Sequence, residues 1–141
     1  MKTYQYQIWH DRFPMPIGQN YMLFLYTPLD IEKMKCAATY LVGEHDFTSF
    51  CSIHTEIEDK VRTIRSIGIK EEGSLLTIDV VGTGFLYNMV RIIVGTLLEV
   101  GKGVYPPEYV QEILNGKDRA LAGPTVPARG LTLVSYSYER A

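Results

Sequence analysis

The chain has 141 residues, of which 46% are hydrophobic and 21% are charged, as is usual for one globular domain, so we expect residues 1–141 to form a single domain. The formal net charge of −2 argues against tight binding of nucleic acid by this chain alone, because phosphate binding requires concentrated cations. Only local basic clusters remain for phosphate contacts: Lys60, Arg62 and Arg65 in one segment, and Lys117, Arg119 and Arg129 near the end.

The first third of the chain predicts two strands and a helix. Alternating aromatic and polar residues predict a half-buried strand over residues 3–9. Prolines and a glycine predict a loop over residues 11–20, and a short strand is expected over residues 21–26. A helix then follows Asp30, its expected N-cap, and stops at Gly43.

The rest of the chain predicts a hairpin, further helices and a last strand. Residues 61–70 and 75–81 alternate on either side of an expected turn at residues 71–73, the pattern of a β-hairpin. The later elements are a helix from Pro106 to Gly116, an ordered loop over residues 122–129 and a strand over residues 131–138. The order β-β-α-β-β-α-α-β predicts an α+β fold, a mostly antiparallel sheet with helices packed on one face.

Residues 84–103, GFLYNMVRIIVGTLLEVGKG, are the most informative segment and predict a buried helix. Apolar residues cover most of its circumference, and the remaining arc holds Asn88, Arg91, Gly95 and Glu99. Arg91 and Gly95 lie on one face, which offers a charge and a place where another backbone or a ligand can come close. The pattern alone leaves two interpretations open: a ligand-binding arginine, or one whose stem lies along apolar surface with its head in water.

Cysteine and histidine spacing predicts no metal site. Cys36 and Cys51 are the only cysteines and form no CxxC pair, so we expect two reduced thiols in a cytoplasmic protein. The histidines show no metal-ligand spacing; they are His10, His45 and His54. No signal peptide is recognised, and the apolar run at residues 84–103 is too short and too polar for a membrane span.

Four segments of the chain together resemble one known family. They are KTYQYQI at residues 2–8, GEHDFTSFCS at 43–52, the run at 84–103 and AGPTVPARGLTLVSYSY at 122–138. In this order they resemble the C-terminal half of the tRNA pseudouridine synthase A family, over essentially the whole chain. The resemblance implies that the chain forms one half of a pseudouridine synthase fold. The complete enzyme would be a homodimeric, cytoplasmic isomerase that converts uridine to pseudouridine in the tRNA anticodon stem-loop. The resemblance also implies that it needs no cofactor and no metal.

The resemblance assigns roles to two residues. Tyr4 matches the active-site tyrosine that stacks on the target base, although its pattern alone favours a half-buried strand aromatic. Arg91 matches the basic residue that pairs with the nucleophilic aspartate. The family's nucleophile lies in a GRTDAG-type motif of the N-terminal half, and no such motif occurs here. We therefore expect no nucleophilic aspartate in this chain and no activity from the chain alone. Its expected partners are the missing N-terminal half of the same protein and the tRNA anticodon arm.

Two alternatives from other functional classes stay open. One is a free-standing RNA-binding module without catalysis, and the other is a small-molecule-binding, regulatory α+β domain. The absent nucleophile favours both for the isolated chain, whereas the family-like positions of Tyr4 and Arg91 favour the synthase half.

Two further pairs of neighbouring polar residues could take part in chemistry, His45–Asp46 and Asp118–Arg119. Asp46 beside His45 suggests a general base, but its spacing from the following residues is more typical of a turn cap. Asp118 and Arg119 match a family loop near the RNA-facing side, or else form a surface salt bridge of little energetic value.

Overall fold

A six-stranded sheet organises the fold in the order β2-β1-β5-β4-β3, with β6 also paired to β1. The computed structural model describes residues 1–14, 21–53 and 57–136. Its strands are β1 (Lys2–His10), β2 (Leu23–Leu25), β3 (Gly43–Asp46), β4 (Val61–Glu72), β5 (Leu75–Gly82) and β6 (Leu131–Tyr136). Every described strand pair is antiparallel except β1–β2, so the predicted, mostly antiparallel α+β fold is confirmed.

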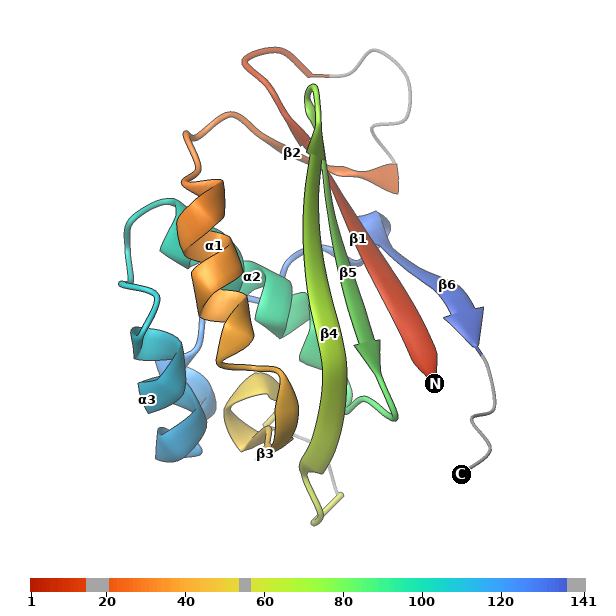
Figure 1. Cartoon of the computed structure of the whole chain (residues 1–141), viewed down its shortest axis with the longest axis vertical. Helices are drawn as coiled ribbons and strands as arrows, with labels where there is room; N and C mark the ends of the chain where they lie inside the picture. Colours follow the sequence, from red (N-terminus) through yellow and green to blue (C-terminus); the bar gives the residue numbers. More distant parts are fainter. Residues whose placement is uncertain (15–20, 54–56, 137–141) are drawn as a thin grey trace.

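The helices lie on one side of this sheet (Figure 1). They are α1 (Ile31–Thr39), α2 (Met89–Gly101) and α3 (Tyr109–Gly116). The chain also forms three short 3₁₀ helices, η2 (Thr48–Phe50), η3 (Arg119–Leu121) and η4 (Ala128–Gly130). Tyr6 and Ile8 of β1 pair with Ile78 and Leu76 of β5, and all four are fully buried beneath the helices. Their alternation with polar residues sets which face of the sheet is covered.

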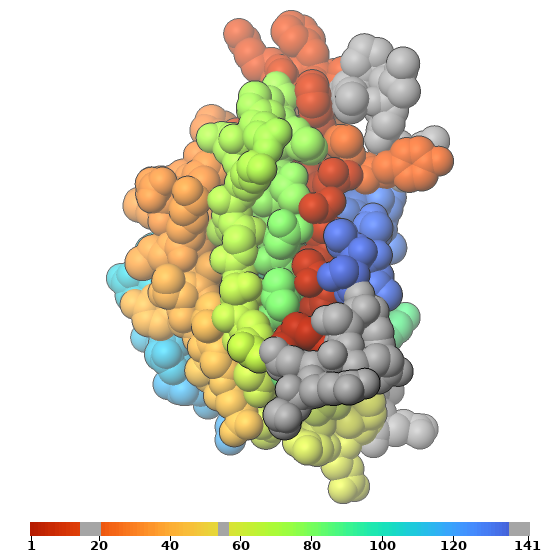
Figure 2. All heavy atoms as spheres, turned by 45° about the vertical axis from the view of Figure 1, so that its right-hand side comes forward, coloured from red at the N-terminus to blue at the C-terminus, as the bar shows by residue number. Residues whose placement is uncertain are grey.

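The other face of the sheet carries polar side chains. Gln5 of β1 pairs with Asp79 of β5 in register, and the Gln5 Nε2 donates to Asp79 Oδ1 at 3.1 Å. Figure 2 shows β4, β5, β1 and β6 side by side on this face, with no helix over them.

β1 is hydrogen-bonded along both of its edges. One edge pairs with β5 from Lys2 to Trp9. The other edge is divided, because β6 pairs with its first half, from Lys2 to Tyr6, and β2 with its last residues, from Ile8 to His10.

The segment after α1 differs from the prediction. Asp30 is the N-cap as expected, since its Oδ1 accepts from Lys33 N at 3.1 Å. However, α1 ends at Thr39, and Gly43, at φ 110°, opens the unpredicted strand β3 instead of only stopping a helix. β3 is four residues long, polar, and paired only with β4 among the described strands. A strand at a sheet edge needs no apolar alternation, so its sequence gave no signal.

The hairpin is confirmed, with a tighter turn than predicted. Glu71 and Glu72 still pair with β5, and the chain reverses at Gly73, whose φ of 60° favours glycine. The imperfect alternation in β4 has a cause, because the register with β5 shifts between Ile64 and Ser66.

The ends of the later elements are also corrected. Helix α2 begins at Met89, five residues after the predicted start at Gly84, because Asn88 adopts the left-handed conformation at φ 62°. Helix α3 begins at Tyr109, after a turn formed by the two prolines. The short strand predicted over residues 21–26 is β2, and the last strand is described to Tyr136. The predictions for residues 15–20 and 137–138 lie outside the described residues.

Candidate active site

A cavity of about 450 Å³ lies between β1, the segment that leads into α2, and the start of β6. Ten residues line it: Tyr4, Phe85, Leu86, Tyr87, Asn88, Met89, Val90, Arg91, Ala128 and Leu131. Tyr4 and Arg91, the two residues singled out in the sequence, therefore contribute to the same cavity although 87 positions (91 − 4) separate them.

Tyr4 presents a half-buried aromatic ring to this cavity. Strand alternation places it on the helix-covered face with Tyr6, but two residues nearer the start of β1. The ring of Phe85 packs edge-on against it, with centroids 5.2 Å apart and planes at 88°. This T-shaped contact fixes the tilt of the Tyr4 ring, and the exposed Tyr87 adds a third aromatic side chain to the cavity.

Arg91 lies on the first turn of α2, half-buried, and its guanidinium is held by two acceptors. Its Nε donates to the backbone carbonyl of Val126 at 2.8 Å, and its Nη1 donates to Asn88 Oδ1 at 3.0 Å. The backbone pairs as well, because Val126 N donates to Arg91 O at 3.3 Å. Among the described residues no carboxylate forms an ion pair with Arg91. The protein therefore holds two of the three guanidinium nitrogens of Arg91, and a ligand-binding role for Arg91 stays a prediction.

The loop that supplies Val126 is seated directly on α2. Gly95 is buried there, and a Cβ built on it would lie 1.7 Å from the carbonyl oxygen of Pro124. At the next residue, the Thr96 Oγ1 accepts from Gly123 N at 2.9 Å and donates to the Ile92 carbonyl of its own helix. The predicted ordered loop and close backbone approach at Gly95 are confirmed. Of the two possibilities that the sequence left for this face, another backbone or a ligand, it is the loop backbone that occupies the space at Gly95.

Tyr6 anchors the far end of the same loop, a role that the sequence pattern did not reveal. It is fully buried, and its hydroxyl donates to the Pro127 carbonyl at 2.7 Å. Burial raises the pKa of Tyr6 to about 12, an effect that the nearby cations of Arg129 and Arg91 partly oppose. The hydroxyl is therefore a structural donor at neutral pH.

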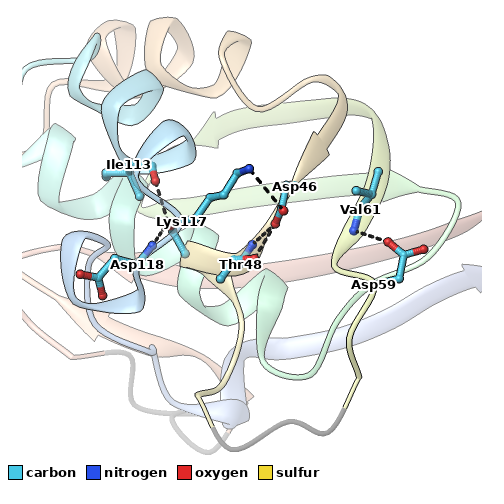
Figure 3. Close-up of polar contacts among 8 residues, drawn as sticks. Asp46, Thr48, Asp59, Val61, Ile113, Lys117 and Asp118 are labelled. Atoms are coloured by element: carbon cyan, nitrogen blue, oxygen red, sulfur yellow. Dashed lines mark hydrogen bonds and ion pairs between the residues drawn. The ribbon is translucent and has the colours of Figure 1, made fainter.

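The Asp46 carboxylate caps a turn, as its spacing predicted. Its Oδ1 accepts from the backbone N and the hydroxyl of Thr48, and Lys117 Nζ lies 4.0 Å from its Oδ2 (Figure 3). The hydroxyl bond of Thr48 is the main cause that lowers the pKa of Asp46. His45 points elsewhere, with Nε2 3.0 Å from the Val42 carbonyl oxygen, so these two residues do not form a general-base pair.

Asp118 and Arg119 form no ion pair with each other. Asp118 caps η3 through its side chain, and its backbone N donates to the buried Ser49 hydroxyl, which itself donates to the Ile113 carbonyl. Arg119 Nη2 donates to Thr125 Oγ1 at 3.2 Å, on the loop before Val126. The surface salt bridge considered for this pair is therefore wrong, and Arg119 instead helps to hold the loop.

Neither basic cluster contributes a lining residue to the cavity. Arg62 of the first cluster donates to the backbone carbonyls of Asp59 and Val61, and Arg129 of the second donates to that of Met22. Within the described ranges, no three His, Cys, Asp or Glu side chains are grouped to hold a metal ion. No helix in those ranges combines the length and hydropathy of a membrane span.

Comparison with known proteins identifies the family. A model of the tRNA pseudouridine synthase family matches residues 37–139. The chain belongs to this family. Three similar proteins bear the name tRNA pseudouridine synthase A: those of Bacillus licheniformis (46% identical), Brevibacillus brevis (48%) and Bacillus subtilis (43%).

The chain spans little more than half the length of these relatives. Each match covers 98% of this chain but only 56% or 57% of the relative. Phe85 contacts Tyr4 and Asn88 contacts Arg91 at the cavity, and sequence reasoning assigned no role to either of them. Phe85 gave no distinct signal inside an apolar run, whereas an asparagine before a long apolar helix is a residue type that tolerates the left-handed conformation.

Proposed function

We propose that the complete protein isomerises uridine to pseudouridine in the tRNA anticodon stem-loop, and that this chain supplies one wall of its active site. The main support for the proposal is that Tyr4 and Arg91 line the same cavity. The chain also belongs to the tRNA pseudouridine synthase family. An aromatic ring and a guanidinium at one cavity suit a nucleobase held beside a carboxylate.

Tyr4 is the proposed stacking platform for the target uracil. A base taken out of its helix loses its neighbours, and stacking on an aromatic side chain returns about 1–3 kcal/mol per base. The edge-on contact with Phe85 holds the Tyr4 ring at a fixed tilt, so little rotational freedom is lost when a base arrives.

Arg91 is the proposed partner of the nucleophilic aspartate. A cation within about 4–6 Å keeps a carboxylate ionised, and a guanidinium also orients it through two parallel bonds. All six aspartates of the chain lie in its described part, and none lines the cavity. In the proposal the nucleophile therefore comes from a segment outside this chain. It attacks the uridine, and the released base turns and rejoins the ribose through carbon.

Binding of the anticodon arm is proposed to rely on the two basic clusters together with the rest of the homodimer. The chain alone carries a net charge of −2, so we expect weak tRNA binding that falls steeply with salt. Tight binding that survives 200 mM salt, a range in which phosphate-driven affinity drops roughly a thousandfold or more, would favour the RNA-binding module instead.

Tritium release from tRNA labelled at uracil C5 tests the activity. This chain is joined to the portion of the Bacillus licheniformis relative that it does not match, and this fusion is called the reconstituted enzyme. We expect the reconstituted enzyme to release tritium and the chain alone, in excess over tRNA, to release none. Turnover by the chain alone, or none by the fusion when the intact relative is active, contradicts the proposal.

Variants of Tyr4 test its role. Tyr4→Phe should retain tRNA binding and base stacking and lose only what the hydroxyl does, whereas Tyr4→Leu should lose both. Tyr26→Leu is the matched control, because Tyr26 is 71% exposed and does not line the cavity. Equal single-turnover rates for Tyr4→Leu and Tyr26→Leu would exclude Tyr4 from the site.

A further inference from the structure

Asn88 adopts a backbone conformation that glycine would fill at least as well. At φ 62° and ψ 6° it is left-handed, and it stands directly before the first residue of α2. Its carbonyl accepts from Ile92 N at 3.0 Å and so begins the helix, but its side chain makes no capping bond to the helix backbone. Since backbone geometry alone does not require an asparagine, its amide calls for a separate explanation.

The amide group of Asn88 is committed to Arg91. Asn88 Oδ1 accepts from Nη1 at 3.0 Å, while the Val126 carbonyl accepts from Nε at 2.8 Å. When two different nitrogens of a guanidinium each donate to a fixed acceptor, the plane of the group is determined. A single bond would leave the group free to rotate. No described residue accepts from Nη2, and because Arg91 lines the cavity, Nη2 remains available to a ligand there.

The Asn88 side chain is uncharged, and this affects how much of the Arg91 charge remains at the cavity. A carboxylate at position 88 would orient Arg91 equally well but would neutralise its charge at the cavity. The amide oxygen orients the guanidinium and leaves its full charge for a second partner. Asn88 itself lines the cavity, so the bonded pair forms part of its wall.

We propose that Asn88 is a positioning residue, which together with the Val126 carbonyl sets the plane of the Arg91 guanidinium so that Nη2 faces the carboxylate of the nucleophile. This inference rests on the proposed function of Arg91. Asn88 does not itself contact the reacting atoms; it acts through Arg91.

The first experiment needs no catalysis. NMR of the chain labelled with 15N-arginine measures hydrogen exchange at Nε and rotation about the Nε–Cζ bond of Arg91, whose signal is assigned by its loss in Arg91→Lys. We expect Asn88→Gly, which suits the left-handed backbone, to speed this rotation several-fold. The control is Asn115→Gly, because Asn115 Oδ1 also accepts a side-chain bond, from Gln111 Nε2 at 3.2 Å, away from the cavity. Unchanged rotation in Asn88→Gly overturns the inference.

The second experiment measures single-turnover rates in the reconstituted enzyme. We expect Asn88→Gly to lower the rate about 10- to 100-fold, the usual effect of losing a hydrogen bond to a charged group, with tRNA affinity and melting temperature close to those of Asn115→Gly. Asn88→Asp keeps the acceptor, so it should keep Arg91 ordered yet lower the rate. A normal rate in Asn88→Gly overturns the inference. An inactive reconstituted wild type instead contradicts the proposed function, while the NMR result still decides whether Asn88 orients Arg91.

Discussion

Gly95→Ala is the substitution that most directly tests how the site is assembled. The added Cβ would lie 1.7 Å from the Pro124 carbonyl oxygen and 2.9 Å from its carbon. Both are backbone atoms, so no side-chain rotation relieves the clash and the loop must retreat from α2. Overpacking of this kind costs about 1–3 kcal/mol, and weakening the bond from Arg91 Nε to Val126 adds about 1–2 kcal/mol.

The sum predicts a loss of about 2–5 kcal/mol in the free energy of unfolding. At about 3 °C per kcal/mol for a chain of this size, the melting temperature should fall by roughly 6–15 °C, and the single-turnover rate of the reconstituted enzyme should fall with it. Gly68→Ala is the matched control, because its Cβ would meet nothing within 4 Å on β4. The reasoning is refuted if Gly95→Ala melts within about 1 °C of the wild type.

Three other substitutions test separate contacts. The pKa of about 12 for Tyr6 against an ordinary 10.0 means that the unfolded state loses its proton first. The Tyr6 hydroxyl therefore makes its full contribution to the free energy of unfolding below pH 10. That contribution falls by about 2–3 kcal/mol between pH 10 and 12. Urea unfolding should show this decline in the wild type, and the part due to this group should vanish in Tyr6→Phe. Ser49→Ala should cost about 1–3 kcal/mol, because the buried Ile113 carbonyl and the partly buried Asp118 N–H lose their partner. Ser66→Ala, at an exposed site, should be neutral by the same assay. Arg91→Lys should slow single turnover at least tenfold, since lysine cannot make a planar two-point contact, and a normal rate would exclude Arg91 from the chemistry.

Hydrophobic periodicity was sufficient to predict the main elements of the fold. The alternation in β1 and in the hairpin reflects a sheet with one covered face, and the apolar run of α2 reflects a helix buried on nearly every side. Periodicity could not find β3, because its residues Gly43–Asp46 are polar and their pairing depends on β4, a later segment of the chain.

The sequence singled out two residues of the candidate cavity, Tyr4 and Arg91, but only part of the cavity's geometry. Helical spacing correctly placed Arg91 and Gly95 on one face. It could not show that a loop more than 25 residues later would fill the space above Gly95 and accept from Arg91. Likewise, the alternation that places Tyr4 and Tyr6 on one face does not say which is buried; that depends on where the loop near Pro127 crosses the strand.

The two-sided pairing of β1 has a consequence for the entropy of recognition. Tyr4 pairs with Val80 on one side and Leu133 on the other, so its backbone is secured before any ligand arrives. A platform on a strand bonded along both edges frays little, and binding energy is not spent on ordering it. The acceptor that holds Arg91 Nε sits instead on a loop, whose position depends on a handful of hydrogen bonds and on the absence of a single methyl group at Gly95. The wall that carries Tyr4 is thus held in place by strand pairing, and the wall that carries Arg91 by the close packing of the loop against α2.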